Sequence, residues 1–199
     1  MIRVSHVTIL PHIASLENER VIEAKEKGKN KAFSLNLANM LTKEYLIIAE
    51  KYEAMRFLGK IFLLKQIYSE ILSIGIDCPV IVFGSYAKSN FTGESDIDIE
   101  ILDILGDRLI SRIKQIGKVY GKEISVRASK AKSFEESIKK HEALAWEIIN
   151  GHIILQGADA FVSILWRYFN ESRPIGMVQE AKERIKAGAG KRNTAKSVL

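Results

Sequence analysis

The sequence predicts an α+β (α/β) chain, with a small mixed sheet that carries helices on one face and polar residues on the other. Three observations lead to this fold class. The apolar run Pro79–Phe83 is typical of a buried strand. In Asp96–Leu102, carboxylates alternate with isoleucines, as expected for a strand with one apolar face. Through residues 38–74, apolar residues recur every three or four positions, which predicts a long helical stretch.

The N-terminal segment predicts a helix followed by a hairpin. Residues 4–18 repeat apolar side chains at helical spacing, with Ser5 as a cap and Pro11 favouring a kink. The short runs Val21–Ala24 and Ala32–Leu35 then read as strands on either side of a turn. This segment is similar to the second half of a winged helix-turn-helix, with the hairpin as a basic wing. Its glutamates offset the basic charge, so we expect DNA binding to be weak or non-specific, if any.

The long helical stretch at 38–74 carries one apolar seam, and Gly75 is expected to end it. We expect the seam to pack on another helix or on the main domain, and a homodimer contact is the alternative. Its residues are Leu41, Tyr45, Ile48, Tyr52, Met55, Leu58 and Phe62.

The second half of the chain continues the alternation of helices and strands. Residues 107–120 predict a helix, and Glu123–Ala128 predict a third strand. Two further helices are expected at 133–150 and 157–170, joined by an apolar link at 151–155. The domain scheme that follows is a winged-helix-like segment at 1–37, a linker or packing helix at 38–76, a catalytic domain at 77–180 and a tail at 181–199.

Composition narrows the functional classes. The chain has 199 residues and a formal net charge of +6. Residues 182–199 hold six basic side chains against one acid, so most of the excess lies in a polar tail that we expect to be disordered. No apolar run approaches the roughly 18 residues that span a bilayer, which argues against a membrane protein. Cys78 is the single cysteine, and a reducing cytoplasm is its simplest setting.

Four residues in the centre of the chain carry the chemistry. Gly84 follows the predicted buried strand and lets the backbone turn tightly toward a ligand, while Ser85 offers a hydroxyl and backbone N–H groups suited to phosphate oxygens. Asp96 and Asp98 share one face of the next strand, about 6.6 Å apart along it. Two adjacent carboxylates repel unless a cation lies between them, and oxygen ligands suit Mg²⁺ or Mn²⁺.

Together these residues form the pattern Gly-Ser, ten residues, Asp-x-Asp. That pattern resembles the signature of the DNA polymerase β-type nucleotidyltransferase superfamily, in its minimal, antitoxin-like branch. The resemblance covers about residues 77–170 and includes the segment Gly-His-Ile-Ile-Leu-x-Gly-Ala at 151–158. It implies the polymerase β-like fold and an enzyme that transfers a nucleoside monophosphate, AMP in the first instance, from a nucleoside triphosphate (ATP) to a hydroxyl.

The resemblance also implies roles for individual residues. Gly84 and Ser85 would bind the triphosphate, and Lys88 stands where relatives often carry arginine. Asp96 and Asp98 would hold the metal ions. The superfamily usually has a third carboxylate on a neighbouring strand, for which Glu123 is the best match. Glu100 is its competitor, because it is in phase with both aspartates, and a solvated strand-start residue is the other reading of Glu123.

The acceptor has three candidates. Relatives in this branch include antitoxins that transfer AMP to a tyrosine of a helical partner toxin, which makes protein AMP transfer the first. Modification of a small molecule such as an antibiotic is the second. The non-enzymatic rival is a DNA-binding regulator that uses the nucleotidyltransferase domain as a ligand sensor or a dimer scaffold.

Overall fold

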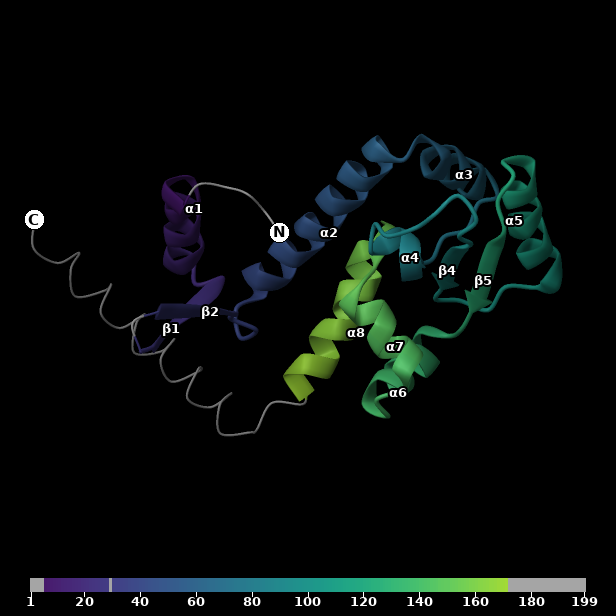
Figure 1. Cartoon of the computed structure of the whole chain (residues 1–199). Helices are drawn as coiled ribbons and strands as arrows, with labels where there is room; N and C mark the ends of the chain where they lie inside the picture. Colours follow the sequence, from purple (N-terminus) through teal and green to yellow (C-terminus); the bar gives the residue numbers. More distant parts are fainter. Residues whose placement is uncertain (1–5, 29, 172–199) are drawn as a thin grey trace, which may run out of the picture. The chain divides into compact units, whose positions relative to one another are not determined.

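The computed structural model describes residues 6–28 and 30–171, and Figure 1 shows their helices and strands in chain order. They form two compact units. One holds the described residues up to Tyr45 and from Phe169 onward, and the other is Leu46–Tyr168. The tail predicted at 181–199, Ser5 and Lys29 lie outside the described residues. The predicted domain limits stay predictions. No helix in the described part is long and apolar enough to cross a membrane.

The N-terminal unit contains the predicted helix and hairpin. Helix α1 spans His6–Asn18, with Pro11 inside it, and strands β1 (Ile22–Lys27) and β2 (Asn30–Leu35) pair antiparallel. The turn between the strands needs Gly28, whose φ is +65°. Polar contacts fasten the far end of the hairpin, where the amide Nδ2 of Asn36 donates a hydrogen bond to the carbonyl of Arg20 at 2.9 Å.

The single helix predicted at 38–74 is two helices. Helix α2 spans Met40–Lys60 and α3 spans Phe62–Ser73. Between them, Ile61 has φ −119° and ψ 86°, which is outside the helical region. Gly59, two residues before the break, has low helix propensity and contributes to the interruption. Gly75 ends α3 as predicted, with φ +76°.

The prediction that the apolar seam of the long helix packs against the rest of the chain is wrong for the middle of the seam. Ile48, Tyr52 and Met55 are 62–66% exposed. The same helix buries a different stripe, which includes Ala54 and Phe57. Helical periodicity permits more than one apolar stripe on a helix, and the pattern alone does not tell which one faces the core.

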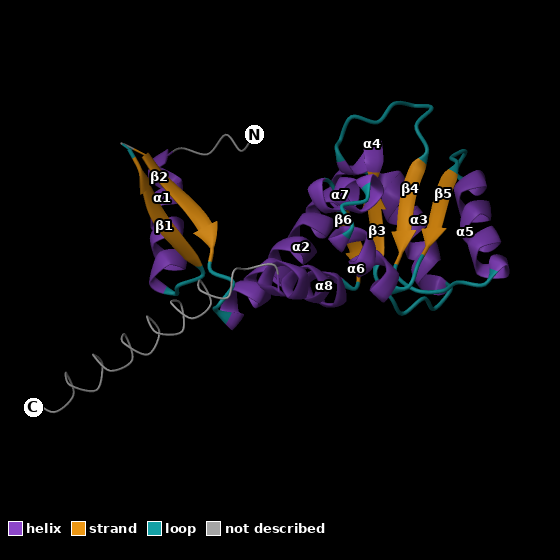
Figure 2. Cartoon of the chain, turned by 90° about the horizontal axis from the view of Figure 1, so that it is seen from below, coloured by secondary structure: helices purple, strands orange, loops and turns teal. Residues whose placement is uncertain are grey.

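A four-stranded mixed sheet is the centre of the larger unit. Its strands are β3 (Val80–Phe83), β4 (Ile97–Ile101), β5 (Ile124–Ala128) and β6 (Ile153–Gln156), in the order β5-β4-β3-β6 (Figure 2). Only β4 and β5 are parallel. The mixed sheet confirms the predicted fold class. The apolar link predicted at 151–155 is wrong, since strand β6 lies there. A strand of four residues is too short to show a periodicity in its sequence.

The two faces of the sheet pack into separate apolar clusters. Val80 and Val82 face the cluster with α3 and α5 (Asp107–Val119). Ile81 and Phe83 face the cluster with α6 (Ala131–Lys139), α7 (Ala143–Asn150) and α8 (Ala158–Glu171). The sequence prediction placed helices on one face. The structure places α6, α7 and α8 on the second face as well, which is also the face that carries the β4 carboxylates.

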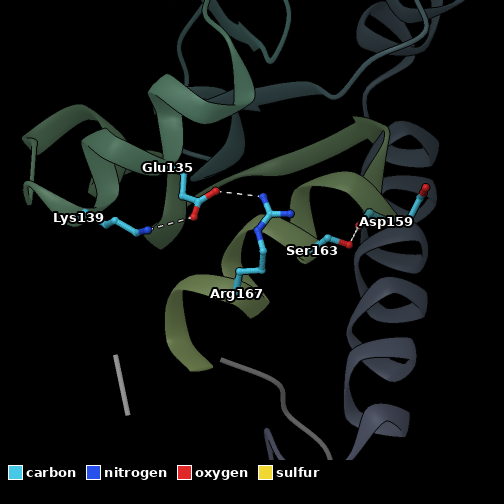
Figure 3. A network of polar contacts seen from close by, with 5 residues as sticks. All are labelled: Glu135, Lys139, Asp159, Ser163 and Arg167. Carbon is cyan, nitrogen blue, oxygen red and sulfur yellow. Dashed lines mark hydrogen bonds and ion pairs between the residues drawn. The ribbon is translucent and has the colours of Figure 1, made fainter. Parts of the chain in front are cut away.

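The helix predicted at 133–150 is interrupted, so α6 and α7 are separate. His141 lies at the interruption with φ +56°, a backbone conformation that no α-helix tolerates. A polar network then joins α6 to α8 (Figure 3). The carboxylate of Glu135 accepts from Arg167 at 3.0 Å and lies 3.2 Å from the Lys139 ammonium. This network fixes α6 beside the sheet face on which the site lies.

Candidate active site

The turn after β3 brings Gly84 directly against Asp98. Gly84 is buried, has φ +68°, and begins the short helix α4 (Gly84–Ala87). A β-carbon built at Gly84 would overlap the Oδ2 atom of Asp98. Glycine is therefore required here twice, by the backbone conformation and by the carboxylate beside it.

The two aspartates lie at the start of β4. Asp98 pairs with Phe83 of β3 on one side and with Ser125 of β5 on the other. Burial, followed by the charge of Asp96 and then by that of Glu147, raises the pKa of Asp98. Asp96 precedes the strand and is exposed. The ionised carboxylate of Asp98 is thus held among negative charges, an arrangement that a bound cation relieves.

Aromatic stacking and two polar contacts shape the loop between Ser85 and Asp96. The rings of Tyr86 and Phe91 stack in parallel with centroids 4.2 Å apart. The Lys122 ammonium donates to the carbonyl of Gly93 at 2.5 Å and lies 5.9 Å from the Tyr86 ring centroid. The hydroxyl of Ser95 accepts from the backbone N–H of Thr92 at 2.8 Å. The loop that delivers Asp96 is therefore fixed at several points.

Lys88 and Glu147 form an ion pair that the sequence analysis missed. The Lys88 ammonium lies 2.6 Å from Glu147 Oε1, and both side chains are a little over 40% exposed. Glu147 comes from α7, far along the chain, and contributes to the raised pKa of Asp98. A signal did exist, because Glu147 is the sole charged residue in the helix Ala143–Asn150.

The two candidates for a third carboxylate have different surroundings. Glu123 is exposed, lies one residue before β5, and accepts a hydrogen bond at its backbone carbonyl from the Ile97 N–H at 2.9 Å. Its metal role stays a prediction. Glu100 is buried in β4 and has partners of its own, with its Oε1 accepting from the Ser129 hydroxyl at 2.6 Å. Burial, partly offset by Ser129 and Arg127, raises the pKa of Glu100.

The donor set at the aspartates suits a metal that is shared with a substrate. Within residues 6–28 and 30–171, no group of three or more His, Cys, Asp or Glu side chains is placed to hold a metal ion. Asp96 and Asp98 supply two carboxylates, and Mg²⁺ or Mn²⁺ commonly takes one or two of these together with phosphate oxygens and water. Burial is the largest cause of the raised pKa of Asp98, and the charges of Asp96 and Glu147 add to it, so a cation beside these carboxylates is electrostatically favoured.

One family model covers the part of the chain that holds this arrangement. Residues 64–150 match the family model of the nucleotidyltransferase domain, a range that includes Gly84, both aspartates and Glu147. A solved structure described as "Crystal structure of the toxin-antitoxin with AMP-PNP" is similar with 16% identity and a TM-score of 0.35, covering 61% of this chain and 92% of that chain. A search of curated proteins finds no match.

Proposed function

We propose that this chain, whose residues 64–150 match the family model of the nucleotidyltransferase domain, transfers AMP from ATP to a hydroxyl acceptor. The contact between Gly84 and Asp98 is the observation that supports this most strongly. This contact places the turn after β3 against the carboxylate of Asp98, which lies near the negative charges of Asp96 and Glu147. A phosphate-binding turn and a metal-binding carboxylate must adjoin in any enzyme that acts on a metal-bound triphosphate.

In this proposal, Gly84 and Ser85 bind the triphosphate through backbone and hydroxyl groups, and Lys88 exchanges its carboxylate partner for a phosphate. The Lys88–Glu147 pair is partly exposed, and such pairs contribute about 0–1 kcal/mol. Giving up that pair for a phosphate therefore costs little. Asp96 and Asp98 would hold Mg²⁺ or Mn²⁺, which when bound would neutralise phosphate charge and lower the pKa of the acceptor hydroxyl.

The transfer itself is a displacement at phosphorus. The acceptor oxygen forms a bond to the α-phosphorus, and the bond from the α-phosphorus to the oxygen bridging to the β-phosphate breaks. Pyrophosphate leaves with that bridging oxygen, and the proton of the acceptor passes to a carboxylate or to water. We assign the third carboxylate role to Glu123, whose backbone carbonyl accepts a hydrogen bond from the N–H of Ile97, the residue that follows Asp96.

The acceptor in this proposal is a tyrosine of a helical partner toxin in a reducing cytoplasm. Its support is the resemblance of the Gly-Ser and Asp-x-Asp pattern to antitoxin-like relatives. A tyrosine hydroxyl is more acidic than an aliphatic hydroxyl, with an ordinary pKa near 10, so its proton would be easier for a neighbouring carboxylate to accept.

Transfer of label distinguishes this reaction from hydrolysis. The full chain, Mg²⁺ and co-purifying or co-expressed proteins are incubated in parallel with ATP labelled at the α-phosphate and at the γ-phosphate. We expect α-label, and no γ-label, on a tyrosine of one partner. The double variant Asp96→Asn/Asp98→Asn should lose this labelling, and Asp103→Asn, which removes an exposed carboxylate outside the site, should keep it. Labelling that persists in the double variant would refute the assignment.

A further inference from the structure

A cavity opens on the same sheet face as the aspartates, further along β4. Its volume is about 320 Å³, and β4, β5, α6 and α7 line it. The polar part of the lining includes Glu100, Arg127 and Ser129, and the apolar part includes Phe134, Leu144 and Ile148. Cavities of this size, largely apolar with a few converging polar groups, are typical of small-molecule sites.

Glu100 lines this cavity, and one oxygen of its carboxylate is unsatisfied. The Glu100 residue is 3% exposed, and its Oε1 accepts from the Ser129 hydroxyl at 2.6 Å. Its Oε2 is buried and has no hydrogen-bond partner in the described part of the chain. The nearest cation is the Nε of Arg127 at 3.6 Å, which is an ion-pair distance beyond hydrogen-bond reach. A buried carboxylate oxygen without a hydrogen-bond donor lowers the stability of the fold. A ligand that supplies the donor therefore gains binding free energy from that hydrogen bond.

This oxygen is close to the site of transfer. Glu100 follows Asp98 by two residues in one strand, so the two side chains share a face and stand about 6.6 Å apart along it. Helix α7 joins both places, because Leu144 and Ile148 line the cavity while Glu147 acts on Asp98. A nucleotide whose phosphates lie at Asp98 therefore has its remaining portion within reach of the cavity.

The charge of the lining excludes the phosphates themselves. Two carboxylates, Glu100 and Glu142, line the cavity against the single guanidinium of Arg127. The net charge of −1 that these three groups carry repels an anion. A neutral, flat group with a hydrogen-bond donor fits better, since Phe134, Leu144 and Ile148 offer apolar walls and Glu100 offers an acceptor.

We propose, as an inference that rests on the transferase function above, that the cavity holds the adenine ring of the donor nucleotide and that Glu100 Oε2 accepts a hydrogen bond from its 6-amino group. Adenine presents one amino donor at this edge, which matches one free oxygen. Guanine presents two adjacent donors and a carbonyl oxygen there, and with Oε1 already engaged by Ser129 the carboxylate matches it less well. Glu100 thereby selects ATP among nucleoside triphosphates.

The sharpest probe is a nucleotide that lacks only the amino group. Binding of ATP, of purine riboside triphosphate and of GTP to the full wild-type chain is measured by titration calorimetry with Mg²⁺ present. We expect ATP to bind on the order of 10-fold more tightly than purine riboside triphosphate, the effect of one hydrogen bond to a charged group. GTP should also bind more weakly than ATP. These comparisons need no variant, so they hold even where a substitution prevents folding.

A variant then locates the preference. In Glu100→Met, ATP and purine riboside triphosphate should bind with affinities within about twofold of each other, because the carboxylate that accepts the hydrogen bond is gone. Glu136→Gln, which removes an exposed carboxylate of α6, should keep the wild-type ratio. Equal affinities in the wild type, tighter GTP binding, or an unchanged ratio in Glu100→Met would overturn the inference and leave the transferase proposal standing. No binding of any nucleotide would refute both, and discrimination without label transfer would refute the transferase proposal alone.

Discussion

Gly84 and Asp98 are in direct contact, so a side chain at the first position would occupy the place of the carboxylate at the second. The residues are separated by a loop in the chain and are joined by the antiparallel pairing of β3 and β4. This relationship makes the turn and the aspartate proposed to bind metal one structural unit, and each can be tested through the other.

Gly84→Ala should damage this unit. The new methyl group meets Asp98 Oδ2, and the φ of +68° disfavours any side chain, so we expect a loss of roughly 1–3 kcal/mol in stability. The melting temperature should fall by several degrees, and the stabilisation by Mg²⁺ with ATP should be largely lost. Gly93→Ala is the matched control, since nothing lies within 4 Å of a β-carbon there. A normal nucleotide response in Gly84→Ala would contradict the assignment.

Asp98→Asn should separate stability from function. Burial, and then the charges of Asp96 and Glu147, raise the pKa of Asp98, so its ionised form is less favourable in the folded protein than in the unfolded chain and ionisation lowers stability above the ordinary value near 4. Replacing it with asparagine should raise the melting temperature of the metal-free protein slightly, on the order of 1–2 °C. The further rise on adding Mg²⁺ and ATP should vanish. A variant that melts lower than wild type without metal, yet still responds to nucleotide, would argue against this electrostatic account.

The third carboxylate is decided by comparing two substitutions. Glu123→Gln should lower turnover by about 100-fold and leave nucleotide affinity nearly unchanged, because its proposed role arises during transfer. Glu147→Gln is the informative comparison, since Glu147 acts electrostatically on Asp98 and pairs with Lys88. Single-turnover transfer and equilibrium titration give the two quantities. Full activity in Glu123→Gln together with an inactive Glu147→Gln would contradict the assignment of Glu123 and favour Glu147 of α7 as the third carboxylate.

His152 gives the larger unit a pH-dependent contact. Burial by itself lowers the pKa of His152, but the hydrogen bond and charge of Glu50, with the carbonyls of Ile148 and Ile149, outweigh burial and raise it. The protonated form of His152 therefore stabilises the fold. This stabilisation is complete at pH values below the ordinary histidine pKa of about 6.5, and it is lost as the pH rises through the raised pKa.

The melting temperature of wild type should therefore exceed that of Glu50→Gln by about 2–4 °C at acidic pH, a difference corresponding to roughly 1 kcal/mol. The gap should close as the pH is raised above neutrality. Lys51→Gln is the control on the same helix, because its exposed contact with Asp159 involves no group that titrates near neutral pH. A gap that is independent of pH would show that Glu50 stabilises without the histidine charge.

The N-terminal unit should not read DNA sequence. A recognition helix must be held rigidly against base edges, and α1 contains Pro11. Binding through the hairpin lysines would be insensitive to sequence and would fall steeply with salt. Selection from random duplexes near physiological salt tests this. Recovery of a defined motif, lost when Lys25 and Lys31 are changed to alanine, would favour a regulator.

The parts of the site that the sequence predicts are those that depend on short-range order. Gly84, Ser85, Asp96 and Asp98 lie within one strand–turn–strand segment, so their spacing specifies their geometry. Strand β4 is predicted correctly for the same reason. The alternation of carboxylates and isoleucines over a few residues indicates which face of the sheet each side chain lies on.

The remainder depends on contacts between distant segments. Glu147 comes within 2.6 Å of Lys88 across 59 positions, and no local pattern encodes that pairing. The buried stripe of α2 and the break at Ile61 depend on which partner the helix meets. His141 shows a further limit, since a non-glycine residue with positive φ interrupts a segment whose apolar pattern predicts one continuous helix.

Strand β6 has a consequence for how the protein is made. It forms one edge of the sheet, and its pairing shields β3, the strand that leads into Gly84. During synthesis the ribosome delivers Ile153–Gln156 long after β3 and β4, so β3 waits with an unpaired edge. A fragment cut at the limits of the family match, 64–150, would keep that edge bare permanently. We expect such a fragment to aggregate, whereas one that extends through α8 should remain dispersed.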